Sequence, residues 1–156
     1  VVFGEPRDKQ RELVALLVSH IRRLEAKGLE IAKNAAKIEK IGKTNLQILF
    51  IEENFPGFGF YPKPGKCVGL VHDYQQRAKK ISSLVTVGVL NSAITIRATD
   101  EANFSVHDLI NLLNKRIPSA FAEGGGHKNA GSITFIPSKK EEVLSALKEF
   151  IKSRNS

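Results

Sequence analysis

The residues best suited to chemistry lie in the segment Gly124–Gly131, where three consecutive glycines are followed at once by His127. Glycine adopts positive φ easily and has no side chain, so successive backbone N–H groups in such a segment can converge on one anion. The imidazole of His127 can donate a hydrogen bond to the same anion. The segment is therefore a candidate phosphate-binding loop, although a tight structural turn explains the glycines equally well.

Arg97 is the second candidate, because it lies near the end of a predicted strand among apolar or small neighbours, where a cation needs a partner. Only one loop and one capped helix separate Arg97 from the glycines. The chain can therefore return the glycine segment to the end of that strand. A guanidinium, an imidazole and backbone N–H groups would then converge on one phosphate. This combination binds a ligand and contains no catalytic group.

Other site chemistries fit the sequence poorly. The pairs His72-Asp73 and His107-Asp108 resemble those of HD-type metal phosphohydrolases, but such sites need further ligands on an all-helical scaffold, and a predicted β-hairpin separates the two pairs. The single Cys67 excludes an internal disulfide and a thiolate-rich metal site. The glycines match neither a Walker A loop nor a dinucleotide fingerprint. No catalytic residue, no metal ligand and no cofactor is predicted in this chain.

Hydrophobic spacing predicts the elements that position these residues. Ser105 is a good N-cap for the helix between Arg97 and the glycines. A loop rich in Pro, Gly and aromatic residues, 54–65, either stacks on bases or covers the rim of the core. The predicted fold is α/β, with a mixed sheet of four to five strands flanked by helices and preceded by a long N-terminal linker helix. The predicted elements are a helix over 8–41 that ends at Gly42, a strand over 46–51, a helix over 67–80, a hairpin of strands 84–90 and 93–98, a helix over 106–117, a strand over 132–136 and a C-terminal helix through Val143 to Ile151.

The long first helix carries a narrow apolar stripe that includes Leu13, Leu17 and Leu24. A helix of about 34 residues is roughly 50 Å long, more than a domain of this size can bury. Part of the stripe is therefore expected to pack on an upstream domain or on a second copy, which makes a homodimer one of the predictions. Charged substitutions at Leu17 or Leu24 would dissociate such a dimer.

Composition sets broader limits. The chain has 156 residues, a formal net charge of +8 and no methionine. The positive charge fits a phosphate-binding track and a solvated basic surface equally well. No run of about 18 apolar residues is present, so the protein is expected to be cytoplasmic and not to bind a membrane. The missing methionine suggests a fragment of a longer protein.

The residues from 124 to 131, the helix that begins after Ser105 and the strand that ends at Arg97 together resemble the C-terminal, DHH-associated substrate-binding domain of DHH phosphoesterases. That family includes RecJ-type exonucleases, nanoRNases and cyclic-dinucleotide phosphodiesterases. The resemblance covers residues 45–152, and the long first helix resembles the linker between the two domains of the family. It divides the chain into a linker helix, 1–44, and the substrate-binding domain, 45–156. Two positions depart mildly from the family pattern: Asn129, where many members have Ala, and Thr95, where a Ser is frequent.

The resemblance implies that the parent protein is a hydrolase, a phosphoesterase or nuclease acting on single-stranded nucleic acid, an oligonucleotide or a nucleotide. It implies substrate-binding roles for Arg97, Gly124, Gly125, Gly126 and His127. The Asp-His-His motif of the family, which holds Mn²⁺, belongs to an N-terminal DHH domain, and this chain lacks the motif. The expected partners are therefore the nucleic-acid substrate and that DHH domain. The alternative is a non-catalytic RNA- or tRNA-binding module related to the C-terminal domain of alanyl-tRNA synthetase.

Overall fold

The computed structural model describes residues 6–55 and 63–156 as an α/β fold with a six-stranded mixed sheet. The predicted fold class is confirmed, with six strands in place of the four to five expected. The aromatic loop predicted over 54–65 lies largely outside the described residues. The order of the strands across the sheet is β1-β2-β3-β4-β6-β5. The strands are β1 (Lys37–Ile41), β2 (Thr44–Phe50), β3 (Leu84–Val89), β4 (Ala93–Ala98), β5 (Glu123–His127) and β6 (Ala130–Thr134).

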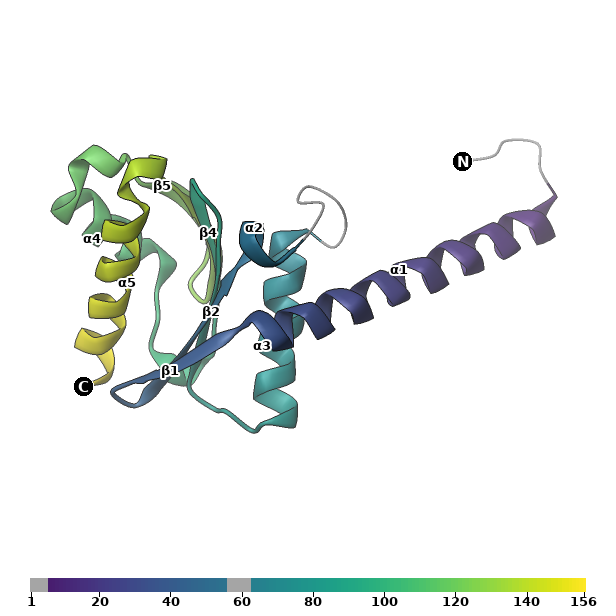
Figure 1. Ribbon diagram of the computed structural model, residues 1–156, viewed down its shortest axis with the longest axis horizontal. Coiled ribbons are helices and arrows are strands. Elements are labelled where there is room, and N and C mark those ends of the chain that lie inside the picture. The colour runs from purple at the N-terminus through teal and green to yellow at the C-terminus, as the bar shows by residue number, and fades with distance from the viewer. Residues whose placement is uncertain (1–5, 56–62) are drawn as a thin grey trace.

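Five α-helices surround the sheet: α1 (Arg7–Ala35), α2 (Ile51–Asn54), α3 (Pro64–Ala78), α4 (Val106–Arg116) and α5 (Lys140–Asn155). Figure 1 shows α4 and α5 on one face of the sheet and α3 on the other, with α1 extending away from the body. The predicted hairpin is present as antiparallel β3 and β4. Ser105 caps α4, because its Oγ accepts a hydrogen bond from the backbone N–H of Asp108 at 3.2 Å. None of the described helices is long and apolar enough to cross a membrane.

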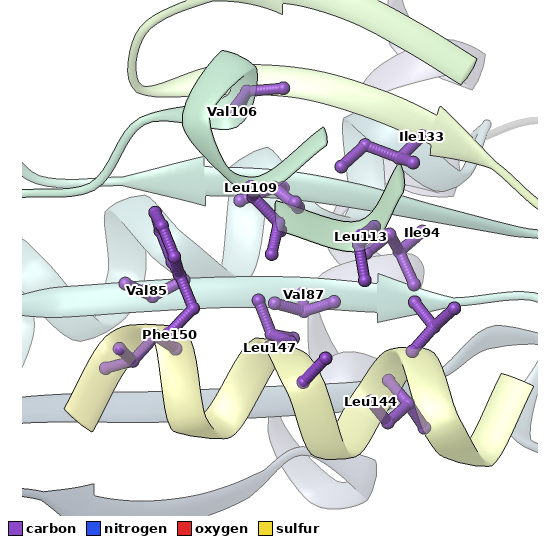
Figure 2. Close-up of a cluster of buried hydrophobic side chains, with 14 of the residues drawn as sticks. Val85, Val87, Ile94, Val106, Leu109, Leu113, Ile133, Leu144, Leu147 and Phe150 are labelled. Atoms are coloured by element: carbon purple, nitrogen blue, oxygen red, sulfur yellow. The ribbon is translucent and has the colours of Figure 1, made fainter. Parts of the chain in front are cut away.

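The main core lies between the sheet and the pair α4 and α5. In Figure 2, strand residues such as Val87, Ile94 and Ile133 meet Leu113 of α4 and Leu147 of α5. These five side chains are fully buried. The core therefore fixes which face of β3, β4 and β6 points inward. The alternate residues of these strands necessarily point to the other face, toward α3.

The predicted helix over 8–41 is too long. The helix ends at Ala35, and the next residues form β1, which pairs antiparallel with β2. Gly42 does not end a helix. It lies in the two-residue turn between β1 and β2 with φ +60°, a conformation that glycine adopts without strain. The helical spacing continued by chance through Ile38, so the hydrophobic pattern gave no sign of the change to strand.

The apolar stripe of α1 is buried only toward its C-terminal end. Gly28 and Ala32 are buried, and Glu25 forms a salt bridge with Lys66 of α3 at 3.3 Å. Farther toward the N-terminus, Leu13 and Leu17 are 51% and 59% exposed. The domain thus covers the second half of α1 with α3, as expected for a helix longer than the domain can bury.

Candidate phosphate-binding site

The strand register places Arg97 and His127 in one line across the sheet. Arg97 of β4 lies opposite Ala130 of β6, and Ala130 lies opposite His127 of β5. Directly paired residues project from the same face of a sheet. The Cα atoms of Arg97 and His127 are therefore about 10 Å apart, two strand spacings. Because Ala130 between them ends at Cβ, the longer side chains on either side can reach one anion above it.

The same line continues into the buried part of the sheet. Thr86 of β3 pairs with Arg97, and Gln47 of β2 pairs with Thr86. We call Gln47, Thr86, Arg97, Ala130 and His127 the Arg97 row. Gln47 and Thr86 lie beneath α3 and are fully buried, whereas Arg97 and His127 are exposed. The row therefore passes from a buried polar end to an open cationic end.

Helix α3 forms the wall beside Arg97. A Cβ atom added to Gly69 would lie 3.4 Å from Nε and Cζ of Arg97, so the guanidinium lies against the helix at a position without a side chain. Gly65, one turn earlier, faces the methyl group of Thr95 in the same way at 3.7 Å. In β3, a Cβ on Gly88 would come within 2.5 Å of Val68. Glycines on both surfaces thus let α3 approach the sheet closely enough to orient Arg97.

A buried histidine supports this end of the row. His72 follows Gly69 by three residues, on the same helix face, and its Nδ1 is 2.8 Å from Oγ1 of Thr86. That Oγ1 also accepts a hydrogen bond from Nε2 of Gln47 at 3.3 Å. The hydroxyl hydrogen of Thr86 is then available to Nδ1 of a neutral His72.

His72 is held in its neutral form. Burial lowers the pKa of His72 below its ordinary value of 6.5, and the positive charge of Arg97 lowers it further, against an opposing effect of Asp73. Among the described residues, no carboxylate forms an ion pair with Arg97. The guanidinium therefore keeps its charge available on the open face of the sheet.

The glycine segment is a strand, and the prediction of a loop there is wrong. Gly124, Gly125 and Gly126 belong to β5, which pairs antiparallel with β6, and Lys128 and Asn129 make the turn. A Cβ on Gly124 would overlap the carbonyl oxygen of Ser132, and a Cβ on Gly126 would overlap that of Ala130. These two glycines allow the strands to approach, and a substrate-binding role for them stays a prediction. A Cβ on Gly125 would meet no described heavy atom within 4 Å, so this glycine keeps the surface open beside His127.

The turn between β5 and β6 is fixed to neighbouring elements. The carbonyl of Asn129 accepts from the N–H of Ala98 at 2.7 Å, and that of Lys128 accepts from the N–H of Val106 at 3.0 Å, at the start of α4. The side-chain amide of Asn129 donates to Asp100. The position that departs from the family pattern thus holds the turn in place, and His127 is presented from a braced strand.

Neither His-Asp pair contributes to this site. His72 is buried in the Thr86 network, and His107 is exposed on α4, on the opposite side of the sheet. Asp108 pairs with Arg154 of α5 at 2.8 Å. In residues 6–55 and 63–156 no group of three or more His, Cys, Asp or Glu side chains is placed to hold a metal ion. The Mn²⁺ implied by the resemblance therefore has no fitting ligand set in the described part of this chain.

Four residues of the site were not predicted as site residues from the sequence, and His72 was considered only as part of a His-Asp pair. The four are Gly65, Gly69, Thr86 and Ala130. The sequence offers one usable signal in the spacing of Gly65 and Gly69. Small residues four apart lie on one face of a helix and mark a close helix contact, and His72 follows on the same face. The register that brings Ala130 beside Arg97 has no local signal, because β4 and β6 are far apart in the sequence, whereas Thr86 faces Arg97 across the predicted hairpin of β3 and β4.

Comparison with known proteins identifies the fold. No family model matches the chain. The uncharacterized protein MJ1198 of Methanocaldococcus jannaschii is 28% identical over 151 residues, which cover 93% of this chain and 20% of that protein. One similar solved structure is the DHH domain of PF0399, described as a member of the s1p family of ribosomal proteins. It is 28% identical with a TM-score of 0.85, and the match covers 96% of this chain and 35% of the PF0399 chain. This chain has the fold of a DHH-associated C-terminal domain.

More distant structures share this fold. The pGpG-specific phosphodiesterase PggH from Vibrio cholerae is 15% identical with a TM-score of 0.55, and the match covers 97% of this chain and 44% of PggH. A manganese-bound exonuclease RecJ is 14% identical with a TM-score of 0.53 over 90% of this chain and 31% of RecJ. The DHH-associated fold described here thus corresponds to a minor part of the length of each of these proteins.

The three glycines of β5 should respond differently to substitution. Gly124→Ala and Gly126→Ala should each destabilise the domain by about 1–3 kcal/mol, because the new methyl group overlaps backbone of β6. Gly125→Ala is the matched control and should leave the stability close to that of the parent chain, since its methyl group points into open space. Urea unfolding at neutral pH measures all three. Equal losses for the three variants would show that strand packing does not distinguish these positions.

Stability should also depend on pH through His72. The folded-state pKa of His72 is lowered, so the unfolded chain takes up a proton more readily. The stabilising contribution is complete above about pH 6.5 and is lost as the pH falls below it toward the folded-state pKa. Between pH 7 and pH 5, the urea midpoint should fall by less in His72→Gln than in the parent chain. Asp108 does not interfere, because Arg154 lowers its pKa below 3.8. An identical pH dependence in both proteins would contradict the assignment.

Proposed function

We propose that this domain binds the phosphate or terminal nucleotide of a short or single-stranded nucleic acid and presents it to metal ions on an N-terminal DHH domain of the parent protein. The observation that carries the proposal is the Arg97 row, which holds a guanidinium and an imidazole on either side of a single small residue. The guanidinium carries no counter-ion pair from the described residues, and the surface beside it is open at Gly125. An oxyanion is the ligand that fits this arrangement best.

The comparisons support a nucleotide as the source of that anion. PggH is described as pGpG-specific and RecJ as an exonuclease, and both have this fold. Manganese in the RecJ structure supports the expectation that the parent protein uses Mn²⁺ outside this chain. In the proposal, Arg97 and His127 bind and orient a phosphate, and hydrolysis belongs to the DHH domain. The long helix α1, with Leu13 and Leu17 exposed, is the surface expected to join that domain.

Loss of either side chain should weaken phosphate binding. Arg97→Ala and His127→Ala should each cost about 1–3 kcal/mol in the binding of a mononucleotide, the usual value of one charge-assisted hydrogen bond. Arg116→Ala is the matched control, since Arg116 pairs with Glu149 of α5 across the sheet from the site. Isothermal titration or NMR titration measures the affinities, and circular dichroism shows that the variants fold. Unchanged affinity in both site variants would overturn the site assignment.

The isolated chain should bind but not cleave. Labelled oligonucleotides incubated with the pure chain and Mn²⁺ should stay intact, and turnover that resists further purification would overturn the division of labour between the domains.

Competition between tRNA and short single-stranded oligonucleotides tests the alternative function. A clear preference for tRNA would favour the non-catalytic RNA-binding module, whereas the proposed function predicts no such preference.

A further inference from the structure

Beyond the Arg97 row, the open face of the sheet carries two more rows of residues in register. Thr95, Ser132 and Gly125 lie opposite one another on β4, β6 and β5. Ala93, Thr134 and Glu123 form the next row. Successive rows are about 6.6–6.8 Å apart along the strands. This face therefore runs from the guanidinium of Arg97 and the imidazole of His127 to a carboxylate at Glu123.

The two hydroxyl groups of β6 on this face, those of Ser132 and Thr134, have their hydrogens committed to the backbone. Ser132 Oγ donates to the carbonyl of Ile94, and Thr134 Oγ1 donates to the carbonyl of Glu123, both at 3.2 Å. A hydroxyl has only one hydrogen, so only the lone pairs of these oxygens remain for a ligand. The ionised carboxylate of Glu123 is also purely an acceptor. The β6 and β5 side chains beyond the Arg97 row therefore offer acceptors and call for donors from a ligand.

The described residues leave room for a ligand on this surface. Ser132, Thr134 and Glu123 are exposed, and a Cβ on Gly125 would meet no described heavy atom within 4 Å. Thr95 turns its methyl group toward Gly65, which closes the α3 side of the row with an apolar contact. A ligand with its anionic end over Arg97 and His127 would thus extend along β6 and β5, over Ser132 toward Glu123.

Resting on the proposed function, we propose that Ser132 and Glu123 bind the free 2′- and 3′-hydroxyls of a 5′-phosphorylated terminal ribonucleotide and make this domain selective for terminal ribonucleotides over terminal deoxyribonucleotides. A ribonucleotide carries a phosphate at one end of its sugar and two adjacent hydroxyl donors at the other, and carboxylates recognise such hydroxyls in nucleotide sites. One row spacing separates the anion site from Ser132, a distance of the size of one sugar. Glu123 also repels a second phosphate at the hydroxyl end.

The test compares AMP with dAMP and with adenosine 3′,5′-bisphosphate by NMR titration of the whole chain. AMP should bind about 2- to 10-fold more tightly than dAMP, the value of one hydrogen bond. Glu123→Gln combined with Ser132→Ala should bring this ratio close to one, because it weakens AMP, which has two ribose hydroxyls, more than dAMP, which keeps only the 3′-hydroxyl. Glu123→Gln alone should improve binding of the bisphosphate. Glu141→Gln, on α5 across the sheet, is the matched control and should change none of these values.

The possible failures separate the two proposals. Equal AMP and dAMP affinities that are both weakened by Arg97→Ala would overturn the ribose assignment and leave phosphate binding in place. CMP is titrated in the same way. If AMP and dAMP bind equally but CMP binds with a different affinity, the acceptors recognise the base, and the ribose assignment is overturned. Affinities that are insensitive to Arg97→Ala would overturn the proposed function, and the ribose assignment with it. Circular dichroism of Ser132→Ala separates loss of its bond to Ile94 from loss of ligand contacts.

Discussion

The site depends on the close pairing of β6 with its two neighbours. β6 lies between β4, which carries Arg97, and β5, which carries His127, so its register alone decides whether the two side chains share a line. Gly124 and Gly126 make the β5 side of this pairing possible, because any side chain there would overlap the backbone of β6. A shift of one residue would turn His127 to the core face and bring a glycine onto the open face. The glycines thus act through strand geometry, and the binding atoms belong to their neighbours.

A second constraint acts from the other side of Arg97. Helix α3 approaches β3 and β4 through Gly65, Gly69 and Gly88, and the guanidinium lies in the space that Gly69 leaves. The approach buries His72 and Thr86 beneath the helix, where each satisfies the other by a hydrogen bond. Because His72 stays neutral there, a second positive charge does not compete with Arg97 for the same anion. The long side chain of an arginine would otherwise lose considerable conformational entropy on binding, and packing against α3 removes part of that cost before the ligand arrives.

Local signals in the sequence predicted the parts of the fold that local interactions determine. The hairpin of β3 and β4 and the Ser105 cap of α4 were predicted from turn and capping residues and are confirmed. Strand β5 was missed because Glu-Gly-Gly-Gly-His has no β-propensity, and only pairing along β6 makes it a strand. Arg97 stood out because a cation in an apolar strand requires a reason. Its relation to Ala130 and His127 involves residues 33 and 30 positions away, which no local pattern encodes.

The net charge of +8 contributes little to the open face itself. There Arg97 and His127 are balanced in part by Glu123, and many of the basic side chains belong to α1, away from the sheet. Long-range attraction to a phosphate backbone would be screened within about 8–10 Å at physiological salt, whereas contacts in the Arg97 row act at hydrogen-bond distance. Recognition on this face therefore rests on the placement of a few groups rather than on a strong positive field. Such a surface distinguishes one end of a ligand from the other, because the guanidinium of Arg97 and the carboxylate of Glu123 lie toward opposite ends of the open face.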